Sequence, residues 1–269
     1  MLVAYPTISS VTDLINEIAK SGFADRKRAH VRLWFRGQPK KDLSLRPRVY
    51  RDGFAKNEDD RLDIERNLTQ DFSILSSSIR GGSENDTELY FLQQHYRMPT
   101  RLLDWTANPM AALFFAAAAV GSLEGPEPDG ELFMMDVWEF QLDASNSPRE
   151  AYDRKFSGIA NGWHPVFRNA VEIISRWRNN IQFPKFIVPV RPHNFDIRIN
   201  LQRSCFTFHV PDQQEITPDT NPSLCRFYIP GDRKTAIRRE LNVLGIDPFR
   251  IFGDLEHLAI TLCEAHGVV

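Results

Sequence analysis

Residues 33–39, LWFRGQP, place an arginine directly after three apolar residues. The apolar run predicts a strand that enters a core, and Arg36 would point away from Phe35 because successive side chains of a strand alternate. Gly37 has no side chain, so backbone or a ligand can approach closely there. A guanidinium offers a fork of donors that suits phosphate, which makes Arg36 a candidate anion clamp. The alternatives are a surface arginine and a structural ion pair.

A second polar group lies in residues 94–106, QHYRMPTRLLDWT, and contains His95, Arg97, Arg101 and Asp104. Burying an unpaired charge is costly, so Arg101 and Asp104 are predicted to be paired, with each other or with groups elsewhere. The group is either a polar plug that fixes the start of the helix after it or part of a site. His95 alone is weak evidence for a site, because a lone histidine is more often a packed core residue.

A third group lies in residues 198–209, RINLQRSCFTFH. If this segment is a strand, Arg198, Asn200 and Gln202 share one face. Such a row of polar side chains lines a pocket or forms a solvated face.

Predicted helices and strands position these groups. Amphipathic or apolar spacing predicts helices over residues 9–21, 59–79, 87–98, 110–120, 169–179, 233–246 and 254–265. Strands are predicted over residues 30–37, 131–140, 185–192, 196–210 and 224–230, with a proline-interrupted extended piece at 43–51. Residues 110–120 are apolar on every side, so that helix is expected to be fully buried. Pro109 suits its first turn, and Thr106 or Asn108 can cap it.

The chain of 269 residues contains no repeat, low-complexity segment or glycine-serine linker, which favours one mixed α+β domain over residues 1–269. Lysine and arginine number 33 against 35 acidic residues, so the net charge favours neither nucleic-acid nor membrane binding, and only a local basic patch would. No signal peptide is apparent, and the longest apolar run, residues 109–121, is too short to span a bilayer unaided. We therefore expect a soluble cytoplasmic protein that does not bind membranes.

Several motifs are absent from the sequence. It has no glycine-rich phosphate loop, nucleophile elbow or clustered His/Cys ligands, which excludes many ordinary enzyme classes. Cys205, Cys225 and Cys263 are far apart and lack metal-ligand spacing, so they are interpreted as reduced, mostly packing residues, and no metal is expected.

Together these segments resemble the FRG domain family, which is named for its Phe-Arg-Gly motif. The matching segments are residues 35–38, 45–51, 64–72, 93–116, 198–209 and 241–259. The resemblance covers about residues 30–260, and residues 1–29 form an N-terminal helix extension. Arg97 and Ser204 stand where the family usually has glycine. Members of this family often look like parts of bacterial defence or toxin systems.

The layout is also similar, more distantly, to that of ADP-ribosyltransferases of the arginine-serine-glutamate type. Their aromatic-Arg-Gly strand holds NAD, a Ser/Thr strand and a helix follow, and a later strand carries a catalytic glutamate. The resemblance implies a split, mostly antiparallel sheet and NAD as the substrate. The residues that it places at the cofactor are Arg36, Gly37, Gln38, His95, Arg101, Trp105 and Thr106, and those in catalytic positions are Asp104 and Gln202.

Gln202 stands near the glutamate position of those enzymes but is neutral. Cleavage of the nicotinamide–ribose bond develops positive charge on the sugar, which a carboxylate stabilises. That carboxylate would have to come from Asp104, Glu131 or Glu240. On the resemblance, the protein is an ADP-ribosyltransferase or an NAD hydrolase, with RNA, DNA or a protein as the acceptor of any ADP-ribose.

Two alternatives stay open. The first is a non-catalytic nucleotide or nucleic-acid binding module, in which Arg46, Arg48 and Arg51 join Arg36 in contacting phosphates. The second is an interaction module of a defence system whose chemistry lies in a partner protein.

Overall fold

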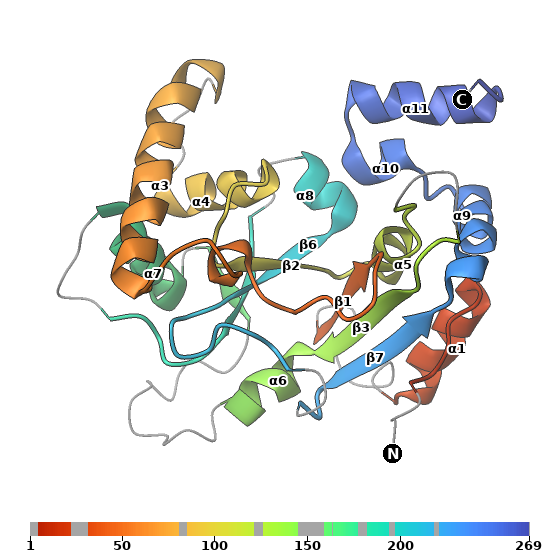
Figure 1. Ribbon diagram of the computed structural model, residues 1–269, viewed down its shortest axis with the longest axis horizontal. Helices are drawn as coiled ribbons and strands as arrows, with labels where there is room; N and C mark the ends of the chain where they lie inside the picture. Colours follow the sequence, from red (N-terminus) through yellow and green to blue (C-terminus); the bar gives the residue numbers. More distant parts are fainter. Residues whose placement is uncertain are drawn as a thin grey trace.

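The computed structural model describes residues 5–22, 32–80, 85–120, 126–144, 159–162, 164–176, 182–193, 197–217 and 221–268 (Figure 1). Parts of the predicted elements, such as residues 30–31, 177–179 and 196, lie outside these ranges. No helix within them is long and apolar enough to cross a membrane.

One seven-stranded sheet with the order β4-β5-β6-β2-β1-β3-β7 forms the centre of the described structure. Its strands are β1 (Leu33–Gln38), β2 (Leu102–Thr106), β3 (Gly130–Asp136), β4 (Ala160–Asn161), β5 (Val188–Arg191), β6 (Ser204–Phe208) and β7 (Leu224–Ile229). Neighbouring strands are antiparallel except β4 and β5, which are parallel. The predicted α+β class with a mostly antiparallel sheet is therefore confirmed.

The sheet is nearly split in its middle. Strand β1 pairs with β3 from Leu33↔Asp136 to Gln38↔Glu131, but with β2 its register contains only Phe35↔Thr106. Beyond that pair the two strands diverge, so backbone groups there are not joined by a ladder.

Helices cover the sheet in two groups. They are α1 (Val11–Lys20), α3 (Glu58–Arg80), α4 (Asp86–His95), α5 (Pro109–Ala116), α6 (Val137–Ala144), α7 (Pro165–Arg176), α8 (Ile197–Gln202), α9 (Lys234–Val243), α10 (Pro248–Phe252) and α11 (Leu255–Ala265), with short 3-10 turns at Arg48–Tyr50 and Gly231–Arg233. Helices α1, α5 and α9 lie beside β1, β3 and β7, whereas α3, α4 and α7 gather at the other end of the sheet (Figure 1). Each group buries its own apolar cluster, and a third cluster fills the opposite face of the sheet.

The apolar helix predicted over residues 110–120 is shorter, and it is not buried all round. Asn108 caps α5 by accepting a hydrogen bond from the Met110 amide, as predicted, and Pro109 occupies the first turn. The helix ends at Ala116, and Phe114 and Phe115 are only half-buried. The expectation of complete burial is therefore wrong for this side of the helix, where the rings of Phe114 and Phe115 meet Phe252.

The segment 196–210 is not one strand. Residues 197–202 form α8, and the strand begins only at Ser204. Arg203 between them has a φ of 48°, in the left-handed region, which separates the helix from the strand. Ile199 is buried, whereas Ile197 and Leu201 are exposed, so the alternating apolar pattern does not mark a strand face.

The end of β3 also differs from the sequence-based prediction. The strand predicted over 131–140 stops at Asp136, whose side chain accepts from the amides of Trp138 and Glu139 and so starts α6. The spacing did not predict β2 or the short helix α10. The three cysteines are free thiols; Cys205 is buried and Cys263 is exposed.

Candidate functional site

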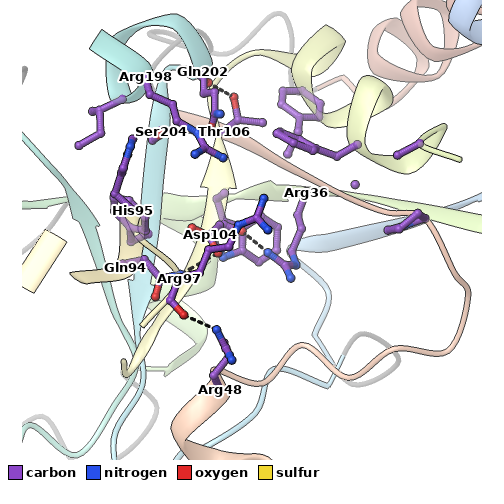
Figure 2. Close-up of a pocket in the computed structure, with 18 of the residues that line it drawn as sticks. Arg36, Arg48, Gln94, His95, Arg97, Asp104, Thr106, Arg198, Gln202 and Ser204 are labelled. Carbon is purple, nitrogen blue, oxygen red and sulfur yellow. Dashed lines mark hydrogen bonds between the residues drawn. The ribbon is translucent and has the colours of Figure 1, made fainter. Parts of the chain in front are cut away.

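A cavity of about 540 Å³ opens where β1 and β2 diverge (Figure 2). The end of α4 and the loop after it, strands β1, β2 and β6, and helices α5 and α8 supply its walls. It is lined by Phe35, Arg36, Gly37, Pro39, Arg48, Arg51, Gln94, His95, Arg97, Met98, Asp104, Trp105, Thr106, Phe115, Ala118, Arg198, Ile199, Gln202, Ser204 and Phe206. The volume lies within the range of about 300–1,000 Å³ that is usual for small-molecule sites.

Arg36 bridges the gap between the two strands. Its Nη1 donates to the main-chain carbonyl of Asp104 over 2.7 Å, as the dashed line in Figure 2 shows. This bond satisfies a carbonyl of β2 in a stretch where β1 no longer pairs with that strand. The Nε of the same guanidinium is buried and has no hydrogen-bond partner among the described residues. Arg36 therefore has a structural bond on one side and an unused donor on the other.

The charge of Arg36 is not neutralised by an ion pair within the described structure. Burial lowers the pKa of Arg36, the Asp104 carboxylate raises it, and the nearby Arg51 lowers it again, so that the pKa lies below its ordinary value. A guanidinium stays protonated at neutral pH in any case. An anion that enters the cavity would be attracted by a cation that the protein has only partly compensated.

Gly37 is required by backbone packing. A Cβ atom there would lie 1.9 Å from the carbonyl oxygen of Ala112 in α5. The close approach predicted at Gly37 is thus the crossing of β1 over α5. This crossing places the residue after Arg36 against the middle and the end of the helix, at Ala112 and Ala116.

Asp104 is the one carboxylate among the residues that line the cavity. Its Oδ2 accepts from Gln94 Nε2 over 2.8 Å, and Gln94 in turn accepts from the Thr100 hydroxyl over 2.6 Å. The carboxylate is exposed, and the chain of two hydrogen bonds orients it toward the cavity (Figure 2).

Four more arginines surround the cavity. Arg48, Arg51 and Arg97 are exposed, and Arg198 is half-buried. Arg48 donates to the main-chain carbonyl of Arg97, which joins two segments across the rim (Figure 2). The lining therefore holds five arginines against one carboxylate, a strongly positive environment within a chain of net charge −2.

The backbone of Arg97 has an uncommon conformation for an arginine. Its φ is 62°, in the left-handed region, where glycine is the ordinary choice and another residue costs about 1–2 kcal/mol. The arginine that stands there adds a cation to the rim of the cavity.

Trp105 forms part of the cavity wall and is held from behind by a buried chain of polar groups. Its Nε1 donates to the Thr207 hydroxyl over 3.0 Å, and that hydroxyl lies 2.9 Å from His209 Nε2. His209 Nδ1 lies 3.1 Å from the carbonyl of Gln214. Burial lowers the pKa of His209 to about 3, so the imidazole is neutral, and the carbonyl fixes its proton on Nδ1.

Most of the predicted site residues meet in this cavity. They are Arg36, Gly37, His95, Asp104, Trp105, Thr106 and Gln202. Thr106 uses its hydroxyl to bond the main-chain carbonyl of Gln202, and Gln202 Nε2 donates to the Ile251 carbonyl over 3.1 Å, so both side chains also fix the local fold. Gln38 lines a smaller adjoining cavity instead.

Arg101 lies outside the cavity lining. Its guanidinium is fully buried, with Nε and Nη2 on Glu65, Nη2 also 2.6 Å from Glu58, and Nη1 2.6 Å from the Tyr50 hydroxyl. The prediction that Arg101 is paired is confirmed. Its partners are Glu58 and Glu65, elsewhere in the chain, and not Asp104.

The other two candidate carboxylates also lie elsewhere. Glu131 pairs with Arg226, and Glu240 accepts from the Val11 amide over 2.7 Å. Asp104 is left as the candidate for carboxylate chemistry in the cavity.

The sequence did not single out several lining residues, among them Phe35, Gln94, Phe115 and Phe206. Phe35 and Phe206 have the apolar spacing of core strands, so nothing marked them as cavity residues. Gln94 lies in the segment 93–116 that resembles the family, and this resemblance was the available signal.

A comparison with family models matches residues 31–122 to the FRG domain. This stretch contains β1, β2 and α5, and therefore the strand gap, Arg36 and Asp104. No curated protein and no solved structure matches the chain. The wider resemblance over about residues 30–260 stays a prediction. No group of three or more His, Cys, Asp or Glu side chains in the described ranges is arranged to hold a metal ion.

Proposed function

We propose that this chain, whose residues 31–122 are an FRG domain, binds NAD in the cavity beside Arg36 and cleaves its nicotinamide–ribose bond. The observation that carries the proposal is the excess of arginine over carboxylate in a concave, partly aromatic cavity. Charged donors of this kind favour phosphate, and Arg36 has a buried Nε without a partner among the described residues.

The apolar part of the lining supports a ligand with flat rings. Phe115 is a half-buried aromatic residue of the lining, and the lining also includes Phe35, Trp105 and Phe206, which are 3–4 % exposed. Aromatic side chains form favourable stacked contacts with flat rings. A nucleotide would use both halves of the cavity if its phosphates lie at the arginines and its base or nicotinamide ring lies against the aromatic part of the lining.

The reaction needs a carboxylate near the sugar. When the bond between C1′ of the ribose and the nicotinamide nitrogen breaks, the bond electrons go to nicotinamide, which leaves as a neutral molecule. Positive charge builds up on the sugar, and the Asp104 carboxylate would stabilise it. Water then adds at C1′ and loses a proton to give ADP-ribose, or an acceptor group of a protein, RNA or DNA adds in its place. Gln202 is neutral and would hold a sugar hydroxyl.

A binding module without catalysis is the second candidate. It is favoured by the exposure of Asp104 and by the hydrogen bonds that already engage Gln202 and Thr106. In that case the exposed Arg48, Arg51 and Arg97 would contact the phosphates of a nucleotide or a nucleic acid. Arg46 would not take part, because it pairs with Glu215 at 2.5 Å.

A role in a bacterial defence or toxin system, with a partner protein, rests on the family resemblance alone. An interaction module that has no chemistry of its own would leave NAD unbound as well as intact.

The test is nicotinamide release from NAD by the purified chain, with and without nucleic acid and cell lysate. We expect release by the wild type and a loss of about 100-fold or more in Asp104→Asn, the magnitude usual for removal of a group that stabilises transition-state charge. Asp71→Asn is the matched control, because Asp71 is an exposed acid outside the cavity lining. NAD that binds without release would support the binding module, and equal release by Asp104→Asn would remove this carboxylate from the mechanism.

A further inference from the structure

A second cavity of about 240 Å³ adjoins the first. The two cavities share Arg36 and Arg51, and the smaller one adds Gln38, Leu43 and Ser44. Its volume lies below the range of about 300–1,000 Å³ that accommodates a whole ligand, which suits one part of a ligand that also occupies the main cavity.

Gln38 lines this cavity, and the oxygen of its side-chain amide is buried without a hydrogen-bond partner in the described structure. Gln38 is 3 % exposed, and its Oε1 has no partner among the residues that the structure describes. A buried polar atom without a partner costs about 1–3 kcal/mol. The Nε of Arg36 is in the same state. An unused acceptor and an unused charged donor therefore belong to residues of one small cavity.

These two groups differ in what they can bind. An amide oxygen accepts a hydrogen bond, so it needs a hydroxyl or an amine, and an ionised phosphate has no proton to give. The guanidiniums of Arg36 and Arg51 need the phosphate. No carboxylate lines the smaller cavity, so nothing in its lining repels an anion. A phosphate that carries a hydroxylated sugar meets both requirements.

We propose that the ligand extends through both cavities, with its pyrophosphate at Arg36 and Arg51 and a second sugar in the smaller cavity. A hydroxyl of this sugar donates to Gln38 Oε1, and Ser44 stands in the same lining. For NAD, the nicotinamide half lies in the main cavity near Asp104, and the smaller cavity takes the ribose of the adenosine half. The inference rests on the proposed function and adds a ligand class: dinucleotides, in preference to mononucleotides.

The experiment compares two probes by calorimetry. One is carba-NAD, a dinucleotide whose nicotinamide–sugar bond is not cleaved, and the other is nicotinamide mononucleotide, which fills only the main cavity. Gln38→Leu removes the amide at a similar volume, and Ser44→Trp fills the smaller cavity from an exposed position. Ser78→Trp, at an exposed serine of α3 outside both cavities, is the matched control.

We expect the wild type to bind carba-NAD at least tenfold more tightly than the mononucleotide. Gln38→Leu and Ser44→Trp should each weaken carba-NAD about tenfold and change the affinity for the mononucleotide less than twofold, while Ser78→Trp changes neither. Unchanged affinity for carba-NAD in both variants would overturn the second subsite and leave the proposed function intact. Equal losses for both probes would show that the smaller cavity is not a separate subsite. If the wild type binds neither probe, the proposed function itself fails. Thermal unfolding checks that each variant is folded.

Discussion

Arg36 makes a structural hydrogen bond to a main-chain carbonyl, which is not the ion pair considered from the sequence, and its anion-binding role is part of the proposed function. Its Nη1 bond to the Asp104 carbonyl is structural, because it replaces a ladder bond where the strands diverge. Its Nε is buried and has no hydrogen-bond partner among the described residues, and we propose that a ligand supplies one. A lysine has a single charged nitrogen and no fork, so it would be a poor substitute at a position that needs donors in two directions.

His209 gives a prediction for the pH dependence of stability. Its pKa is about 3 in the folded chain and about 6.5 when unfolded, so the unfolded state binds more protons between these values. Folded-state stability therefore falls as the pH drops below 6.5, by up to about 1.4 kcal/mol per pH unit. Between pH 7 and pH 5, His209 should account for a loss of about 2 kcal/mol in the free energy of unfolding.

Urea unfolding of the wild type and of His209→Gln at pH 7 and pH 5 measures this loss. Glutamine keeps a donor and an acceptor for the Gln214 carbonyl and the Thr207 hydroxyl but does not titrate. The variant should be less stable at pH 7 and lose about 2 kcal/mol less than the wild type on acidification. The same pH dependence in both proteins would mean that His209 is not held neutral.

At the scale of single residues, the sequence indicated which side chains to examine, and their role as a site stays a prediction. The residue types around Arg36 and Asp104 pointed to anion chemistry, and the structure brings both into one cavity. The sequence could not show that Arg101 lies outside the site, because it is three positions from Asp104 and carries the same charge as Arg36. Only the position of Glu65, on a distant helix, decides that Arg101 is a buried structural cation.

Helix α3 is joined to the residue just before β2 by the buried network of Arg101. Burial alone would lower the pKa of Arg101, but the adjacent Glu65 carboxylate and the Tyr50 hydroxyl raise it above its ordinary value. Removal of the Arg101 guanidinium leaves the Glu65 carboxylate buried without its cation. Arg101→Met should therefore lower the free energy of unfolding by about 3–5 kcal/mol.

Arg176→Met is the matched control for this loss. Arg176 pairs with Asp86 at 2.5 Å, but its side chain is 57 % exposed, so the variant should lose less than about 1 kcal/mol. Carba-NAD affinity should stay within twofold of the wild type in folded Arg101→Met, because the residue does not line the cavity. A larger loss of affinity with little loss of stability would return Arg101 to the site.

Helices with caps or amphipathic spacing were predicted well, and short elements were not. Asn108 and Pro109 define the start of α5, and the spacing of α1, α3 and α9 is visible in the sequence. Helix α8 has six residues with an alternating apolar pattern, which fits a strand equally well. Its packing against α10 and the left-handed Arg203 decide the outcome, and neither is a local signal.

For the molecule as a whole, net charge conceals the main electrostatic feature. The 33 basic and 35 acidic residues nearly cancel, yet five arginines from distant segments converge on one cavity. Other arginines of the described residues pair with carboxylates, such as Arg226 with Glu131 and Arg238 with Glu127. Composition could not predict which arginines line the cavity and which are paired elsewhere, because this depends on the charges that the sheet brings together.

The most direct test of whether these arginines bind a nucleotide is calorimetry of carba-NAD with the wild type and with Arg36→Ala. The wild type should bind, and Arg36→Ala should bind at least tenfold more weakly, because the buried guanidinium is lost. Arg168→Ala, which removes a half-exposed arginine from α7, should bind like the wild type. If folded Arg36→Ala binds carba-NAD as tightly as the wild type, or the wild type does not bind it, the cavity beside Arg36 is not a nucleotide site.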